Sequence, residues 1–103
     1  MPKDAHVTRV LFREVKAGLF KGCIEAVFPD LIGTNSPDSC VCYAHIGQHG
    51  AGYVSYFQTA TRNALPKQYA SLKRELGGMG YNLKVLSRFP SNSFRLRLEQ
   101  VQA

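Results

Sequence analysis

The chain has 103 residues, 45% of them hydrophobic, and a formal net charge of +6, a composition typical of one small globular domain. The longest stretch without Asp, Glu, Lys or Arg, residues 39–61, is interrupted by glycine, glutamine and histidine, which excludes a membrane-spanning helix there. The sequence opens without a signal-peptide pattern, and its three cysteines fit reduced thiols better than a disulfide framework. We therefore expect residues 1–103 to form a single cytoplasmic domain with no cofactor and no membrane partner.

Alternating apolar and polar residues predict strands in the first part of the chain. Residues 7–15 alternate in this way, as expected for a strand that is buried on one face. Residues 16–18 mark a turn, and a second strand is predicted from about residue 21 to residue 28, where Pro29 and Asp30 end it. These two strands are expected to form a hairpin.

A second hairpin is predicted in the middle of the chain. Residues 31–39 are dense in turn-forming residues and predict a loop. A third strand is expected over residues 39–46, and a fourth over residues 53–57, which are rich in aromatic and β-branched side chains. The three glycines of residues 47–52 indicate the turn between them.

From Pro66 onwards the hydrophobic pattern becomes helical. Tyr69, Leu72 and Leu76 recur at the spacing of one helix face. Pro66 suits the first helical turn, where its missing N–H costs nothing, and Gly77–Gly78 supply a stop. The sequence therefore predicts one amphipathic helix that begins at Pro66.

The last part of the chain returns to the pattern of strands. Residues 81–85 alternate, residues 90–93 break the pattern, and residues 94–98 alternate again, so residues 90–103 are expected to be an extra strand or a tail. The predicted order is ββββαβ, with a possible extra C-terminal strand. This order is typical of an α+β fold with a mainly antiparallel sheet of about five strands and one helix packed on a face.

Four potential metal ligands lie within ten residues, namely Cys40, Cys42, His45 and His49. The two cysteines are spaced one residue more tightly than the usual pair of a structural zinc site. Strand alternation also places Cys40 and Cys42 on one face and His45 on the other. We therefore predict no metal site and interpret the cysteines as small buried hydrophobic residues.

The same segment contains a candidate ligand-binding or catalytic site. His45 and His49 are candidate general bases, and the intervening and following residues Gly47, Gln48 and Gly50 add an amide and exposed backbone N–H groups that suit an anion. The alternative is structural: the glycines permit positive φ angles and the imidazoles hydrogen-bond to loop carbonyls. Both interpretations stay open at this point.

The positive charge is concentrated in the C-terminal part of the chain. Residues 1–61 hold five Lys or Arg and five Asp or Glu, whereas residues 62–103 hold eight against two. Seven of these cations are predicted to form one face that neutralises phosphates, with Tyr81 and Phe94 as stacking platforms. The alternative is an ordinary solubilising surface. The seven residues are Lys67, Lys73, Arg74, Lys84, Arg88, Arg95 and Arg97.

Four segments carry a resemblance to a known group of proteins: Val10–Arg13, Ala26–Pro29, Cys42–Gly50 and Tyr69–Val85. Together they resemble small uncharacterised bacterial proteins of phage and conjugative-element origin that carry a His-x-Gly-Gln-His-Gly motif, here residues 45–50. The resemblance implies a compact α+β domain and no particular activity. Those proteins often have Thr-Pro-Glu-Glu at the start of the helix, where this chain has Leu65-Pro66-Lys67-Gln68 and is therefore more basic.

We expect the protein to be a non-enzymatic binding module, of mobile-element origin, that contacts nucleic acid or a nucleic-acid-associated protein through its basic C-terminal part. One alternative is a small enzyme or ligand-binding domain that uses His45 and His49 at the glycine-rich turn. A second alternative is a protein-interaction or dimerisation domain, in which residues 94–98 form an edge strand of a homodimer.

Overall fold

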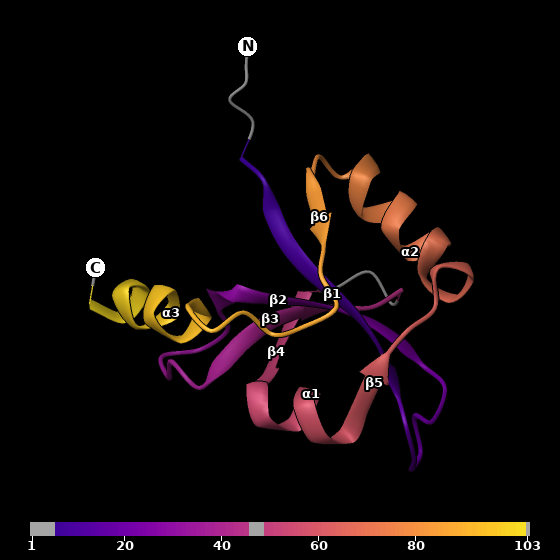
Figure 1. Ribbon diagram of the computed structural model, residues 1–103, viewed down its shortest axis with the longest axis horizontal. Helices are drawn as coiled ribbons and strands as arrows, with labels where there is room; N and C mark the ends of the chain where they lie inside the picture. The colour runs from indigo at the N-terminus through magenta and orange to yellow at the C-terminus, as the bar shows by residue number, and fades with distance from the viewer. Residues whose placement is uncertain (1–5, 46–48, 103) are drawn as a thin grey trace.

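A computed structural model describes residues 6–45 and 49–102 of the chain (Figure 1). These residues form six strands and three helices. In chain order they are β1 (Thr8–Val15), β2 (Ile24–Ile32), β3 (Ser39–Tyr43), β4 (His49–Tyr53), α1 (Val54–Ala60), β5 (Thr61–Asn63), α2 (Pro66–Gly78), β6 (Leu83–Val85) and α3 (Ser93–Gln102).

The strands form one sheet in the order β4-β3-β2-β1-β5, with antiparallel neighbours throughout. The outer edge of β1 is shared by two short strands. β5 pairs with residues 13–15 of β1, whereas β6 runs parallel to residues 8–10. The predicted α+β fold with a mainly antiparallel sheet is confirmed, and the predicted helix is confirmed as α2.

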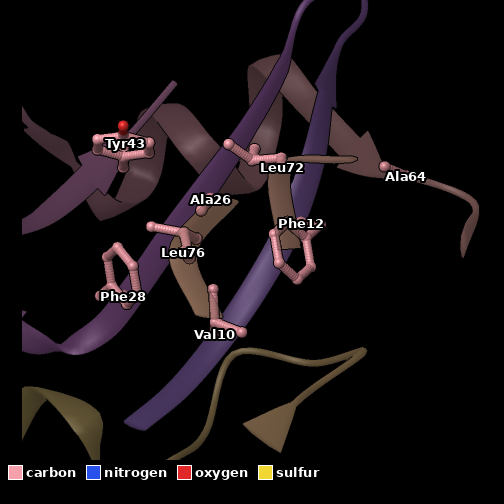
Figure 2. Close-up of a cluster of buried hydrophobic side chains, with 8 residues drawn as sticks. All are labelled: Val10, Phe12, Ala26, Phe28, Tyr43, Ala64, Leu72 and Leu76. Atoms are coloured by element: carbon pink, nitrogen blue, oxygen red, sulfur yellow. The ribbon is translucent and has the colours of Figure 1, made fainter. Parts of the chain in front are cut away.

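β1 is buried on both faces, not on one as the alternation predicted, because helices cover both sides of the sheet. Val10 and Phe12 belong to the first core, on the side of α2, whereas Leu11 belongs to the second core, on the side of α1. Figure 2 shows the first core, and the ring of Tyr69 on α2 stacks on that of Phe12 with 4.3 Å between ring centroids. The first core consists of Val10, Phe12, Ala26, Phe28, Tyr43, Ala64, Leu72 and Leu76.

The second strand does not end at Pro29 and Asp30 as predicted but continues to Ile32. The pairing of β2 with β3 shifts register between Phe28 and Ile32. Proline has no N–H to donate to a neighbouring strand. It is tolerated at such an irregularity because the regular ladder of hydrogen bonds is interrupted there. The residues expected to stop the strand therefore lie within it.

The predicted strand over residues 53–57 is wrong, because α1 begins at Val54. Of the glycine-rich segment predicted to be a turn, residues 49–52 instead belong to β4, and residues 47 and 48 lie outside the described residues. A Cβ atom on Gly52 would lie 2.7 Å from the ring of Phe57, so only glycine allows this ring to pack against the end of β4. Burial of Phe57 in the second core thus outweighs the strand propensity of the segment.

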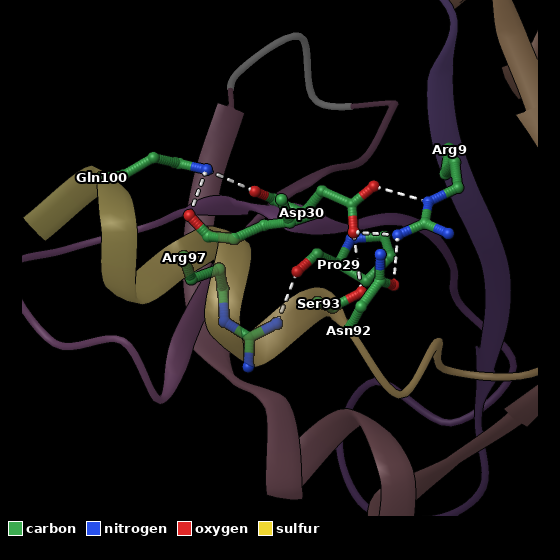
Figure 3. A network of polar contacts seen from close by, with 8 residues as sticks. Arg9, Pro29, Asp30, Asn92, Ser93, Arg97 and Gln100 are labelled. Carbon is green, nitrogen blue, oxygen red and sulfur yellow. Dashed lines mark hydrogen bonds and ion pairs between the residues drawn. The ribbon is translucent and has the colours of Figure 1, made fainter.

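The predicted strand over residues 94–98 is also wrong, because these residues lie within α3. Figure 3 shows that polar side chains dock this helix on β2. The hydroxyl of Ser93 donates to the Asp30 carboxylate, and the amide of Gln100 donates to the Asp30 carbonyl. Arg97 donates to the carbonyls of Pro29 and Pro37. A dimer through an edge strand at residues 94–98 therefore has no strand to use.

Candidate functional site

The two histidines lie on either side of the connection between β3 and β4. β3 ends at Tyr43 and β4 begins at His49. Gly50 is an exposed residue of β4, whereas Gly47 and Gln48 lie outside the described residues. Both imidazoles form hydrogen bonds on the side of the sheet that α2 covers.

Glu75 on α2 is the centre of a polar cluster with His45. The Nδ1 atom of His45 lies 2.6 Å from Oε1 of Glu75, and its Nε2 atom lies 3.2 Å from Oγ of Ser71. The hydroxyl of Tyr43 donates a hydrogen bond to Oε2 of Glu75. Ser71 and Glu75 are four residues apart on α2 and so share one side of the helix. The cluster therefore joins α2 to the end of β3.

The hydrogen bonds of the cluster set the charge of Glu75. The bond from Tyr43, and then the one with His45, lower the pKa of the Glu75 carboxyl. The same bond to Glu75, with burial, raises the pKa of the Tyr43 hydroxyl. Glu75 is therefore ionised and Tyr43 neutral near pH 7. The carboxylate accepts a hydrogen bond from Nδ1 of His45, which orients the ring so that Nε2 faces the hydroxyl of Ser71.

His49 forms a second contact between the sheet and the segment that follows α2. Its Nε2 atom lies 2.7 Å from the hydroxyl of Tyr81. The Tyr81 ring stacks on Phe28, with 5.2 Å between centroids, and the His49 ring lies 4.8 Å from that of Tyr43. The two histidines are thus part of one layer of aromatic and polar side chains beside the first core. Tyr81 is packed in this layer and is not the free stacking platform that the sequence suggested.

The cluster residues on α2, Ser71 and Glu75, were not among the residues singled out from the sequence. Each comes directly before a core leucine, Leu72 or Leu76, and so lies on the flank of the buried stripe. Glu75 is also the only acidic residue within α2. A single acidic residue on the flank of a basic helix indicates that this residue has a partner on the sheet. The sequence pattern does not identify His45 as that partner.

The four potential metal ligands do not converge. Cys40 is buried in the second core and Cys42 packs against it, whereas His45 and His49 hold partners on the opposite face of the sheet. Burial raises the pKa of the Cys40 thiol to about 12, against the opposing charge of Arg97. No group of three or more His, Cys, Asp or Glu within residues 6–45 and 49–102 could hold a metal ion.

Three of the seven predicted phosphate-binding residues form what we term the α2 face: Lys67, Lys73 and Arg74. All three side chains are exposed on one helix. The only acidic residue of that helix, Glu75, is occupied by Tyr43 and His45. The outward surface of α2 therefore carries positive charge without an acidic side chain to offset it.

Three further predicted cations are exposed but lie outside the α2 face. Lys84 alternates with Leu83 and Val85, which pack against the first core, so its side chain points to the opposite side of the sheet. The other two are Arg88, in the segment after β6, and Arg95, on α3. Figure 1 shows α2 and α3 on opposite sides of the molecule, so the seven residues do not form one continuous face as predicted.

Arg97 is the exception among the seven because it is only 4% exposed. Its guanidinium donates to two backbone carbonyls and lies 5.8 Å from the ring centroid of Phe94. It lines a cavity together with Val54 and Gln58 of α1. Arg97 therefore holds α3 on β2 and the loop after it and is not available to a phosphate.

Comparison with known proteins identified no family model, no curated protein and no solved structure that matches the chain. The resemblance to proteins of phages and conjugative elements therefore stays a prediction. Among the described helices, none combines the length and apolar character needed to cross a membrane.

Proposed function

We propose that the protein is a non-enzymatic nucleic-acid-binding module and that the α2 face contacts the phosphate backbone. The observation that carries this proposal is the set of three exposed cations on α2, whose only acidic residue is occupied by the sheet. The proposal places the protein in the cytoplasm, where its free thiols stay reduced, and keeps a mobile-element origin as a hypothesis.

The spacing of the α2 face suits a polyanion. Lys67 and Arg74 are seven residues apart and so lie about 10 Å apart along the helix axis, roughly three base steps of one nucleic-acid strand. Ala70, an exposed residue between them on the same side, is small. It leaves room for a sugar-phosphate backbone to approach the helix. Neutralising phosphates releases condensed counterions, which drives binding at low salt.

The test compares two variants of equal net charge. The α2 variant carries Lys67→Gln, Lys73→Gln and Arg74→Gln. The control variant replaces three exposed cations outside the α2 face, with Lys84→Gln, Arg88→Gln and Arg95→Gln. Both remove three positive charges, so a difference between them reports position and not total charge.

Binding is measured by fluorescence anisotropy of a labelled 20-base-pair DNA duplex at low salt. We expect the α2 variant to lose affinity by about tenfold or more and the control variant by less than about threefold. Equal losses would show that only net charge matters and would reject the α2 face. No binding by the wild-type protein would reject the whole proposal. Circular dichroism verifies that both variants are folded.

A second candidate function is favoured by the contacts of His45. Glu75 orients its imidazole so that Nε2 faces the Ser71 hydroxyl, which is the arrangement that activates a serine for acyl or phosphoryl transfer. Ser71 lies in the interior of α2, where the backbone N–H groups are already used by the helix. They are not free to stabilise an oxyanion, which is why nucleic-acid binding is our first proposal.

Labelling with diisopropyl fluorophosphate tests this second candidate. Attack by Ser71 Oγ would form an O–P bond and release fluoride, with His45 taking the proton. The expected result is a mass increase on Ser71 that is absent from the Ser71→Ala and His45→Gln variants. A wild-type protein that stays unlabelled would reject an activated serine.

A further inference from the structure

The connection between β1 and β2 exposes two large apolar side chains. We term residues 16–22 the hairpin tip. Leu19 is 92% exposed and Phe20 is 63% exposed. They are adjacent in the chain, so they form one apolar projection at the end of the hairpin. Neither contributes to the two cores, and apolar groups placed together in this way mark a contact surface.

The hairpin tip is held by its own backbone. The N–H of Gly22 donates to the carbonyl of Val15, and the N–H of Lys21 donates to the carbonyl of Gly18. Gly18 and Gly22 have φ angles of +90° and +87°, which side chains other than glycine rarely adopt. Two glycines thus make a defined turn whose outermost residues are apolar. The N–H of Lys16 also donates to the carbonyl of Ala60, which anchors the base of the tip to the end of α1.

Positive charge surrounds this apolar projection. Lys16 and Lys21 are both exposed, one on each side of Leu19 and Phe20, and residues 15–24 contain no acidic residue. In Figure 1 the hairpin ends at the lower right, below β5 and to the right of α1, whereas α2 lies at the upper right and α3 at the left. β5 pairs with β1 up to Val15, next to the tip, and then runs antiparallel to β1, away from the tip, into α2, so the tip and the start of α2 lie along one edge of the sheet.

We propose that the hairpin tip inserts Leu19 and Phe20 as a wedge between the bases of the nucleic acid held by the α2 face. Lys16 and Lys21 then contact the phosphates on either side of the opened step. Apolar side chains used in this way partly unstack a base step, while contacts with the backbone supply the affinity. This inference rests on the proposed function and adds a preference for deformed nucleic acid to it.

A lipid surface fits the hairpin tip less well. The side chains of Leu19 and Phe20 together have fewer carbons than one myristoyl chain, which alone binds a membrane only marginally. A second copy of the same tip would bring four lysines together. A wedge needs only one or two apolar side chains, because the α2 face provides the main attraction. The size and charge of the tip therefore favour nucleic acid.

The wedge predicts a preference for duplexes that are already unstacked, because less stacking has to be broken. The experiment compares a labelled 20-base-pair duplex with the same duplex carrying a single-nucleotide bulge. We expect the wild-type protein to bind the bulged duplex about tenfold more tightly. The Leu19→Ser/Phe20→Ser variant should lose this preference and keep its salt-dependent affinity for the perfect duplex. A matched control is Phe94→Ser, which removes an exposed aromatic ring from α3.

The outcomes separate the wedge from the proposed function. Salt-dependent binding without a preference for the bulge, or a preference that survives in the tip variant, would overturn the wedge alone. Failure of the wild-type protein to bind either duplex would overturn both. Sedimentation with phosphatidylserine vesicles provides the third arm: vesicle binding that the tip variant loses, with an unchanged bulge preference, would assign the tip to lipid and overturn the wedge.

Discussion

Replacing Arg97 with alanine should destabilise the protein strongly, although Arg97 is one of thirteen cations in a basic chain. Arg97 is 4% exposed, and its guanidinium donates to the carbonyls of Pro29 and Pro37. Removing it leaves both carbonyls without this donor. Arg95, two residues earlier in α3, is exposed and serves as the matched control.

The two carbonyls set the magnitude. The hydrogen bond to Pro29 is buried, so leaving this carbonyl unpaired should lower the free energy of unfolding by about 2 to 3 kcal/mol. The bond to Pro37 is only partly buried, so water can replace the donor and the cost is about 1 kcal/mol. The sum is a loss of about 3 to 4 kcal/mol in the free energy of unfolding for Arg97→Ala. Arg95→Ala should change it by less than about 0.5 kcal/mol.

Urea denaturation followed by circular dichroism measures this difference. With a slope of about 1.5 kcal/mol per molar urea, the midpoint for Arg97→Ala should fall by about 2 to 2.7 M. The midpoint for Arg95→Ala should stay within about 0.3 M of the wild type. Equal midpoints for the two variants would refute the structural role of Arg97 and would mean that its side chain is exposed like that of Arg95.

Three further predictions concern Leu72, Asp30 and two of the cysteines. Leu72→Ala should lower the free energy of unfolding by about 2 to 5 kcal/mol through a cavity in the first core, measured by the same urea titration; a change below about 1 kcal/mol would contradict its burial. Burial is the largest influence on the Asp30 carboxyl and opposes ionisation, but hydrogen bonds from Arg9 and Ser93 and the charges of Arg9 and Arg97 outweigh it and lower its pKa. Stability from Asp30 is therefore present above the ordinary aspartate pKa and lost as pH falls through the lowered value, so Asp30→Asn should flatten the acid side of the stability profile below about pH 4. Ellman's reagent at pH 8 should modify the exposed Cys23 quickly and Cys40 only on unfolding, and rapid reaction of Cys40 in the native protein would refute its burial.

The fold was predictable where side-chain burial follows the hydrophobic pattern. α2 carries its apolar residues at helical spacing and begins and ends with Pro66 and Gly78, so its existence and bounds could be read from the sequence. α1 could not, because its residues favour strands locally. The contact between Gly52 and Phe57 that redirects the chain is a tertiary one.

α3 was missed for a different reason. Ser93, Arg97 and Gln100 recur at helical spacing, but they dock the helix through hydrogen bonds to β2 and the loop after it. A search for apolar periodicity does not register a polar stripe, and the alternation of Phe94 and its neighbours resembled a strand instead.

The candidate site was predictable from the sequence only in its two histidines. His45 and His49 stood out by residue type, but their contacts lie on α2 and at Tyr81, about thirty residues away in the chain. The sequence does not show which flank of α2 meets which strand end. Net charge likewise did not separate Arg97 from the exposed cations, because burial depends on the docking of α3.

The salt dependence of duplex binding tests the proposed nucleic-acid function most directly. Each phosphate neutralised on duplex DNA contributes about 0.9 to the slope of the logarithm of the association constant against the logarithm of salt concentration. The three cations of the α2 face should therefore make the wild-type slope steeper than that of the α2 variant by about 2.7, equivalent to about 40-fold in affinity between 50 and 200 mM salt. The control variant should keep the wild-type slope. Equal slopes for the wild-type protein and the α2 variant would contradict the account.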